Sequence, residues 1–354
     1  MMAAKCPPIF RLGVTIENHR RLKVYRIDPP KDFAKWARIC EHVVRHYNEG
    51  WADGFTYGIQ YWEIWNEPHN SGPDPERNEM WTGTPQQYYD LYEITAKHLK
   101  ACFGDSIKVG GFASCGFYAI HDEPERYGFS FPAKKRSDDS RQRNCYFIDF
   151  NEGFLAHVKR TGAPLDFYSW HSYANVTETT QMADYIDGVL TRYGFGEVET
   201  QLNEWNNAHQ REYWGTSYAS AQLAAMILAF QRKKTDILCY YDARIGTSPY
   251  GGLFNPMTLT PVAAYYSLKA FGELYALGTE AACHGFGDGV YAIAAKGEAG
   301  EAVMIANIGE DVEITTNLTG MKAYQIDAEH FMTEGELDPT AFTLTKNTVV
   351  LLKR

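Results

Sequence analysis

Residues 61–68 read Tyr-Trp-Glu-Ile-Trp-Asn-Glu-Pro, an apolar run that closes on two polar residues and a proline. Such a run, bounded by a residue that breaks regular structure, predicts a buried β-strand. The next patterned segment, 84–103, has apolar residues at helical spacing, with Thr84 as N-cap and Pro85 at the first helical position. A strand followed by a helix is the building unit of a parallel sheet covered by helices.

The same order of strand and then helix repeats along the first 277 residues. The predicted strands are nearly continuous apolar runs, as expected when both faces of a parallel sheet are buried. Six such units in a row predict an α/β domain of the barrel type, whereas the charged, unpatterned segment 122–143 predicts a long loop. Strands are predicted at 9–17, 61–68, 106–114, 166–174, 198–206 and 237–244, and helices at 32–51, 84–103, 145–160, 179–193, 217–234 and 260–277.

The pattern changes after about residue 278, where short strands alternate with turns rich in Gly, Asp, Glu and Asn. This alternation of short strands and turns is typical of an all-β domain. We therefore predict two domains, a (β/α) barrel domain over 1–278 and a small β-sandwich over 279–354. The strands of the second domain are predicted at 290–296, 302–307, 312–318, 323–327 and 342–352.

Composition excludes several classes of protein. The formal net charge of −10 argues against a nucleic-acid partner, because binding phosphates requires a basic face. The seven cysteines are scattered and form no Cys-x-x-Cys pair, so we predict reduced thiols, a cytoplasmic location, and neither a disulfide framework nor a zinc site. No apolar run approaches the roughly 18 residues of a membrane span. Aromatic residues make up 14% of the chain, which weakly favours carbohydrate as a ligand.

Two short motifs carry the chemistry. Glu67 lies at the end of the second predicted strand, in Glu-Ile-Trp-Asn-Glu-Pro, and Glu204 at the end of the fifth, in Leu-Asn-Glu-Trp-Asn. Catalytic groups of α/β barrels sit at the carboxyl ends of strands. Glycosidic cleavage needs two carboxyl groups, about 5–5.5 Å apart in retaining enzymes and about 6.5–9.5 Å apart in inverting ones. The pair therefore predicts a glycoside hydrolase.

The sequence also resembles glycoside hydrolase family 39, whose retaining β/α-barrel enzymes include β-xylosidases and α-L-iduronidases. Besides the two motifs, the resemblance extends over 10–13, 29–33, 45–47 and 170–173. It implies that Glu67 is the acid/base and Glu204 the nucleophile. It further implies that Asn66 binds the sugar 2-hydroxyl, and that His171 and Tyr173 hold the nucleophile or the sugar. No cofactor or metal is implied.

Further candidates follow from their places in the predicted barrel. Glu17 and His19 end the first predicted strand and would lie near the sugar, or else cap a loop. Trp205 and Tyr241 would form a platform for the sugar face, although an aromatic residue at a barrel rim is often a packing residue. Glu63 is predicted to be a buried structural carboxylate. His69 and Asn70 either line the pocket or lie in a solvated loop.

The resemblance leaves two barrel strands unaccounted for. A barrel of this type has eight strands and six are predicted, so the chain is expected to lack the first two β/α units. Such a chain is a fragment of a longer gene, a protein whose own segments fill the gap, or an oligomer. Because exposed strand edges favour pairing with another chain, we predict a homo-oligomer that covers them. A catalytically weak carbohydrate-binding or scaffold protein remains the alternative to an enzyme. Among enzymes, arabinofuranosidase, β-glucosidase and β-galactosidase specificities remain open.

Overall fold

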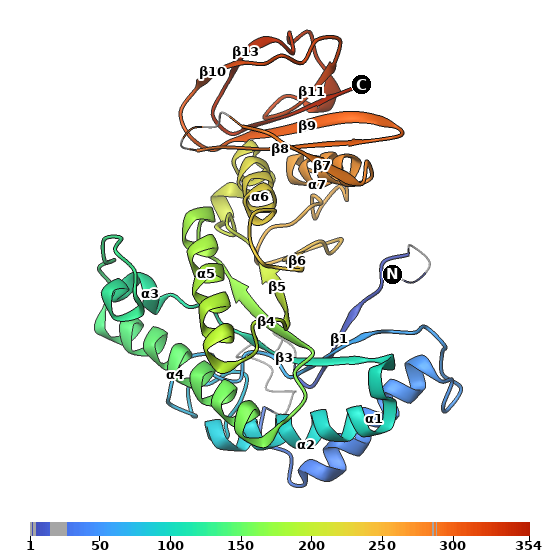
Figure 1. The fold of residues 1–354 in the computed structure, drawn as a ribbon, viewed down its shortest axis with the longest axis vertical. Helices are drawn as coiled ribbons and strands as arrows, with labels where there is room; N and C mark the ends of the chain where they lie inside the picture. Colours follow the sequence, from blue (N-terminus) through green and yellow to red (C-terminus); the bar gives the residue numbers. More distant parts are fainter. Residues whose placement is uncertain (1, 3–4, 15–26, 285–286, 288) are drawn as a thin grey trace. The chain divides into compact units, whose positions relative to one another are not determined.

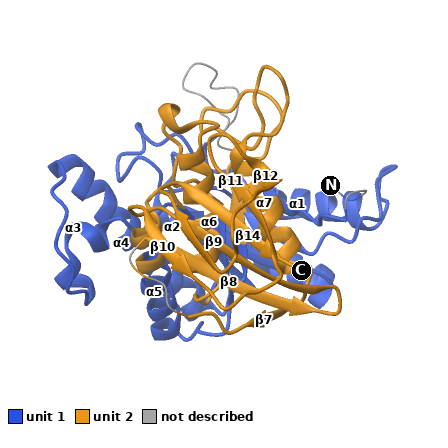
Figure 2. Ribbon diagram, turned by 90° about the horizontal axis from the view of Figure 1, so that it is seen from above, with its two compact units in different colours: residues 1–171, 182–203, 235–237 blue, residues 172–181, 204–234, 238–354 orange. Residues whose placement is uncertain are grey.

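The computed structural model describes residues 2, 5–14, 27–284, 287 and 289–354. The chain divides into two units, coloured in Figure 2. Unit 1 comprises 1–171, 182–203 and 235–237, and unit 2 comprises 172–181, 204–234 and 238–354.

A six-stranded sheet with the order β1-β2-β3-β4-β5-β6 organises the first 240 residues. The first four strands pair in parallel, with Ile9 opposite Tyr61 and Tyr61 opposite Lys108. This arrangement confirms the predicted α/β fold, and β4, β5 and β6 each contribute residues to both units. The strands are β1 (Ile9–Leu12), β2 (Tyr61–Ile64), β3 (Lys108–Ser114), β4 (Phe167–Ser172), β5 (Glu199–Trp205) and β6 (Ile237–Tyr240).

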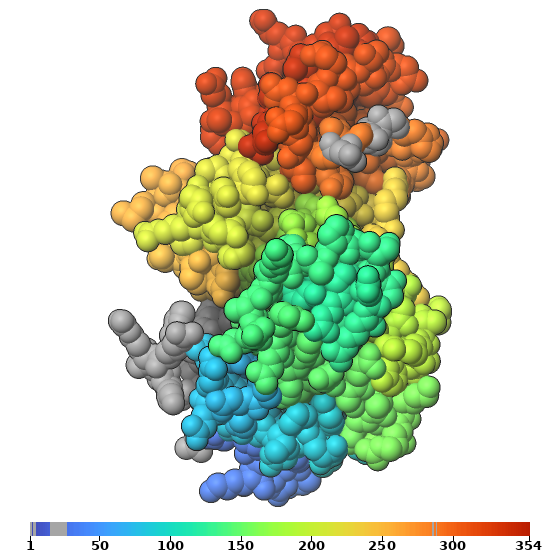
Figure 3. Space-filling model, turned by 90° about the vertical axis from the view of Figure 1, so that its left-hand side faces the viewer, coloured from blue at the N-terminus to red at the C-terminus, as the bar shows by residue number. Residues whose placement is uncertain are grey.

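Helices cover the sheet of unit 1. Helices α1 (Phe33–Asn48), α2 (Pro85–Phe103) and α4 (Asp138–Thr161) lie side by side, with α2 packed on β2 and β3 (Figure 1). The surface of this part of the chain is drawn in blue to green in Figure 3. Helix α5 (Val176–Tyr193) leads from β4 to β5. The buried side of α2 carries Tyr88, Tyr92 and Leu99, so the apolar stripe read from the sequence is the face that packs.

Polar caps fix where these helices begin. The side chain of Asp32 accepts a hydrogen bond from Lys35 N, and α1 starts at the next residue. Thr84 forms a capping box with Gln87, ahead of Pro85. These side chains satisfy amide groups that have no partner inside the first turn. Both helix starts are therefore at or within one residue of the predicted ones.

The segment 122–143 is less irregular than predicted. Helix α4 already begins at Asp138, because the Ser137 side chain accepts a hydrogen bond from Ser140 N and two aspartates occupy the first turn. Acidic residues there favour the helix, since the N-terminal end of its dipole is positive. The prediction of a continuous loop is thus wrong for 138–143. Short helices also occur at α3 (Ala119–Asp122), η2 (Gly104–Ser106), η3 (Pro124–Tyr127) and η4 (Arg211–Tyr213).

Unit 2 is built around an antiparallel sheet with the order β12-β11-β14-β9-β8-β7. Helices α6 (Ser217–Phe230) and α7 (Ala263–Tyr275) pack together and against β8 and β9. A second sheet of two strands pairs β10 with β13. The strands are β7 (Thr279–Ala281), β8 (Val290–Gly297), β9 (Gly300–Asn307), β10 (Val312–Thr315), β11 (Lys322–Ile326), β12 (Phe331–Glu334), β13 (Ala341–Leu344) and β14 (Thr348–Lys353).

One apolar core joins the two antiparallel sheets. It contains Ile305 from β9, Leu344 from β13 and Leu352 from β14, all nearly inaccessible to solvent. The predicted single strand 342–352 is in fact two strands, because the chain turns at Asn347, where φ is +60°. Strands β7 and β12 were not predicted, since they are short and largely exposed. The domain boundary at residue 278 stays a prediction.

Two findings bear on the cellular setting. Within the described part of the chain, no helix is both long and apolar enough to span a bilayer. All seven cysteines are free thiols. The cytoplasmic location stays a prediction.

Candidate active site

The segment after β2 holds Glu67 in an unusual backbone conformation. Trp65 and Glu67 both have positive φ, +73° and +42°, which costs of order 1–3 kcal/mol per residue. Trp65 is anchored by its indole nitrogen, which donates to Met80 O at 2.8 Å. Its ring lies so close to Gly13 that a Cβ there would come within 2.5 Å of it. Packing therefore forces the backbone turn that presents Glu67.

Both carboxylate oxygens of Glu67 have partners in unit 1. His171 Nδ1, at the end of β4, lies 2.7 Å from Oε1, and Asn70 Nδ2 donates to Oε2 at 2.8 Å. The Glu67 side chain is only 7% exposed. Burial alone would raise the pKa of Glu67, but the hydrogen bond and charge of His171 outweigh it and lower the pKa below its ordinary value.

Glu63 lies in β2, four residues before Glu67, and both of its carboxylate oxygens have hydrogen-bond partners. Arg11 Nε lies 2.5 Å from Oε2, and Asn203 Nδ2 donates to Oε1 at 2.6 Å. Burial would raise the pKa of Glu63, yet the Arg11 charge brings it below its usual range. The contacts agree with the predicted structural role, because this carboxylate ties β1, β2 and β5 together.

Asn66 stands out among the buried polar residues. Its side chain is fully buried, and neither Oδ1 nor Nδ2 has a hydrogen-bond partner among the described residues. An unsatisfied buried amide costs about 1–3 kcal/mol for each group left unpaired. His69, by contrast, is buried among aromatic rings with Nε2 3.2 Å from Ser114 Oγ, and burial lowers its pKa to about 3.

In unit 2, Glu204 is held by a tyrosine. Tyr173 donates its hydroxyl to Glu204 Oε1 at 2.6 Å, and Glu204 is 2% exposed. The Tyr173 ring is itself fixed, because it stacks on Tyr250 with centroids 5.2 Å apart and meets the edge of His209 at 5.3 Å. A rigid phenol donor thus orients this carboxylate.

Of the remaining predicted site residues, the structure describes two, Trp205 and Tyr241. Trp205 is buried and packs edge-on against Tyr240, with centroids 5.2 Å apart. Tyr241 is partly exposed, and its hydroxyl accepts a hydrogen bond from Arg244 Nη2 at 2.9 Å. Their role as a sugar platform stays a prediction. Glu17 and His19 lie outside the described residues.

Several contacts at these sites were not predicted. Asn206 donates through Nδ2 to the carbonyl oxygens of Tyr241 and Tyr250, both at 2.9 Å, and so fixes the loop after β6. Asp242 binds Arg244 Nε at 2.8 Å and accepts from Ser248 at 2.9 Å. The contacts of Asn206 could have been found from the sequence, because Asn206 belongs to the Glu-Trp-Asn motif. Nothing in the local sequence indicates the contacts of Asp242.

The fold is of the class found in α/β-barrel proteins. Solved structures of this fold include a glucosidase from Croceicoccus marinus, with a TM-score of 0.71 and 20% identity over 93% of this chain and 75% of that one. A monomeric β-xylosidase from Caulobacter crescentus CB15 has a TM-score of 0.68 and 15% identity, over 99% of this chain and 82% of that one.

Sequence comparison narrows the class. The sequence profile described as Glycosyl hydrolases family 39 matches residues 20–222, more than half of the chain. A β-xylosidase from Geobacillus stearothermophilus is 35% identical over 95 residues, which are 25% of this chain and only 16% of that relative. A second β-xylosidase, from Caldicellulosiruptor saccharolyticus, is 29% identical over 90 residues, again 16% of its length. The chain belongs to glycoside hydrolase family 39.

Proposed function

We propose that this chain is an exo-acting retaining glycosidase whose substrates are β-xylosides or related small glycosides. Family membership supports an enzyme over the carbohydrate-binding alternative. The β-xylosidase names of the sequence relatives support xylose as the preferred sugar. A glucosidase among the structural neighbours makes a β-glucoside the first competitor to test.

In this proposal Glu67 is the acid/base and Glu204 the nucleophile. The observation that carries it is the spacing of their partners along the chain. His171 binds Glu67 and Tyr173 binds Glu204, and these two partners are only two residues apart at the end of β4. Residues two apart in an extended chain point to the same side, with Cα atoms about 6.5 Å from each other. One short segment therefore serves both carboxylates, as cleavage of one bond requires.

The proton for the leaving group comes from the Glu67–His171 pair. The hydrogen bond and charge of His171 lower the pKa of Glu67 and so favour its ionised form. The proposal requires that His171 is doubly protonated in this state. A shift of one proton from Nδ1 to Oε1, along the 2.7 Å hydrogen bond, gives a protonated Glu67 and a neutral His171. The pair holds the same number of protons in both forms. Glu67 then protonates the glycosidic oxygen and Glu204 attacks the anomeric carbon.

Release of the sugar reverses these roles. Glu67, now ionised, takes a proton from water while the hydroxide oxygen attacks the glycosyl carbon and Glu204 departs. The amide of Asn66, which has no hydrogen-bond partner among the described residues, fits the predicted contact with the sugar 2-hydroxyl, because a hydroxyl both donates and accepts hydrogen bonds. Such a contact strengthens in the transition state and offsets the cost of the buried amide.

The test is hydrolysis of nitrophenyl β-xyloside and β-glucoside by the wild type, Glu67→Ala and Glu204→Ala. NMR of the first product should show the β-anomer, the signature of retention. Glu67→Ala should keep activity only on glycosides with strongly activated leaving groups, which need no acid. Glu204→Ala should be inactive on all of them, because no covalent intermediate can form.

An exposed glutamate provides the matched control. Glu76→Ala should behave as the wild type, since the Glu76 side chain is exposed. An α-anomer as first product, or a Glu204→Ala variant with wild-type turnover, would end the proposal.

The predicted association of copies is also retained as a proposal. Strands β1 and β6 are the two ends of the six-stranded sheet, and each pairs with one neighbour within it. We propose that a second copy covers these strands.

A further inference from the structure

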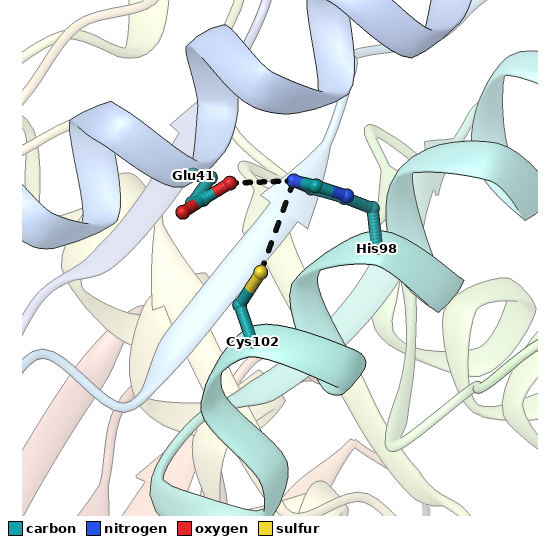
Figure 4. A group of neighbouring side chains, drawn as sticks. All are labelled: Glu41, His98 and Cys102. Carbon is teal, nitrogen blue, oxygen red and sulfur yellow. Dashed lines mark hydrogen bonds and ion pairs between the residues drawn. The ribbon is translucent and has the colours of Figure 1, made fainter.

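Helices α1 and α2 bring together three partly exposed side chains with metal-binding atoms (Figure 4). Glu41 comes from α1, whereas His98 and Cys102 are one helical turn apart on α2. His98 Nε2 lies 2.7 Å from Glu41 Oε2 and 3.8 Å from Cys102 Sγ. All three donor atoms lie within 4.8 Å of one another.

These distances are close to those of a zinc site. Bonds of about 2.1 Å to nitrogen and oxygen and about 2.3 Å to sulfur place the donors of tetrahedral zinc about 3.4 to 3.6 Å apart. The sulfur–nitrogen pair is therefore already near its final spacing. The nitrogen–oxygen pair must open by less than 1 Å, which a rotation of the Glu41 side chain supplies. Thiolate, imidazole and carboxylate together suit zinc better than calcium or magnesium, which prefer oxygen.

The neighbouring charges leave one oxygen of Glu41 for a metal. Arg45 Nε binds the other oxygen, Oε1, at 2.8 Å, and Arg45 Nη1 binds Glu49 Oε2 at 2.5 Å. The guanidinium is thus held by two carboxylates and stacks over the Phe103 ring, 5.0 Å from its centroid. Its positive charge is partly neutralised, and it fixes Glu41 on the side away from His98.

An ion can reach the three donors without unfolding of the helices. Cys102 is exposed and the His98 side chain is 31% accessible. A water molecule from solvent can then fill the fourth position of a tetrahedral ion. No residue of the proposed catalytic machinery takes part.

We propose that Glu41, His98 and Cys102 form a binding site for one zinc ion, separate from the glycosidase site. On binding, the Cys102 thiol gives its proton to solvent, and the His98 ring exchanges protons with solvent until Nδ1 carries its one proton and Nε2 carries none. Sulfur, His98 Nε2 and Glu41 Oε2 then each form one bond to zinc. The Glu41–His98 hydrogen bond is lost in exchange. The ion then links α1 to α2, so it stabilises unit 1 by favouring the folded state.

A second cluster on α2 and α4 provides an internal comparison. His157 Nε2 lies 2.8 Å from Glu93 and 4.0 Å from Asp90. It has no sulfur donor, and Lys97 binds the same glutamate at 2.7 Å. Binding at this cluster would therefore leave no thiolate signature.

The experiment titrates the full chain with zinc in competition with a chromogenic chelator and then with cobalt as a spectroscopic substitute. The wild type should bind one equivalent and show thiolate-to-cobalt charge-transfer absorption in the near ultraviolet. Cys102→Ser should lose that absorption, and Cys102→Ser and His98→Gln should each weaken zinc binding by about tenfold or more. Cys6→Ser, which removes another exposed thiol, and His157→Gln should match the wild type.

Two results would overturn the proposal. One is a wild type that binds no zinc in competition with a chelator weak enough to release it. The other is a Cys102→Ser variant that binds zinc as tightly as the wild type or keeps the charge-transfer band. Because Cys102 is exposed, we expect Cys102→Ser to fold. Circular dichroism of this variant should confirm its folding before the zinc titration.

Discussion

At the scale of single residues, His171 controls the protonation of Glu67. The imidazole lies 2.7 Å from the buried carboxylate and lowers its pKa against the effect of burial. In His171→Gln a neutral amide replaces the charge, burial then dominates, and the pKa of Glu67 rises. In the proposed mechanism the wild-type pair shares one proton and the alkaline limb of the kcat/KM profile reports its loss from the pair, whereas in the variant Glu67 must hold that proton alone. We therefore expect the alkaline limb to move to lower pH by about 1 unit or more.

The pH profile of nitrophenyl xyloside hydrolysis measures this shift. His209→Gln is the matched control, because His209 touches the Tyr173 ring and not Glu67. Its alkaline limb should stay in place. A His171→Gln profile whose alkaline limb is unmoved, or lies at higher pH, contradicts a proton shared between His171 and Glu67.

His69 gives a prediction about stability instead of activity. Burial lowers its pKa from 6.5 to about 3, so the folded chain keeps it neutral while the unfolded chain takes up a proton. Its contribution is fully present above pH 6.5 and is lost as the pH falls from 6.5 toward 3. Between pH 6.5 and 5 the free energy of unfolding should fall by up to ~1.4 kcal/mol per pH unit from this group.

Urea unfolding at several pH values between 7 and 5 tests the prediction. His69→Gln should have a flatter dependence than the wild type, even where its overall stability is lower. His330→Gln, at a partly exposed histidine in unit 2, should keep the wild-type slope. Equal slopes in all three proteins would show that His69 is not the group responsible.

At the scale of elements, the start of α2 depends on the Thr84 capping box. The Thr84 side chain accepts a hydrogen bond from Gln87 N, and the Gln87 side chain accepts one from Thr84 N at 2.8 Å. Thr84→Ala should lower the free energy of unfolding by about 1 kcal/mol, measured by urea denaturation. Thr177→Ala, at an exposed position within α5, should change it by less than about 0.5 kcal/mol.

The elements that were predicted well are those specified by local chemistry. Thr84 and Pro85 mark a helix start within a few residues of sequence, and α2 begins where they place it. The start of α4 was missed because Ser137 and two aspartates form an N-cap that also resembles a charged loop. Strand β12 was missed because its residues are largely exposed and have no apolar alternation; pairing with β11 makes it a strand.

Site residues in short local motifs could be predicted from the sequence, whereas contacts between residues distant in the sequence could not. Glu67 and Glu204 could be named because each follows a recognisable strand within a short motif. The stacking of Tyr250 on Tyr173 could not, because the two rings are 77 residues apart and meet only through the loop after β6. The Glu41–His98–Cys102 cluster was missed for the same reason, since its carboxylate comes from another helix.

At the scale of the whole molecule, the proposed association of copies concerns the two ends of the six-stranded sheet. Unpaired strand edges present amide and carbonyl groups to other chains. All four residues of β6 are half-buried, so apolar side chains lie beside that edge. We therefore expect light scattering to give twice the mass of one chain, with dissociation on dilution.

Leu238→Lys should lower the mass toward that of one chain, because a lysine at a strand edge opposes pairing. Circular dichroism should confirm that this variant is folded. A wild type with the mass of one chain at every concentration would exclude association through β1 and β6.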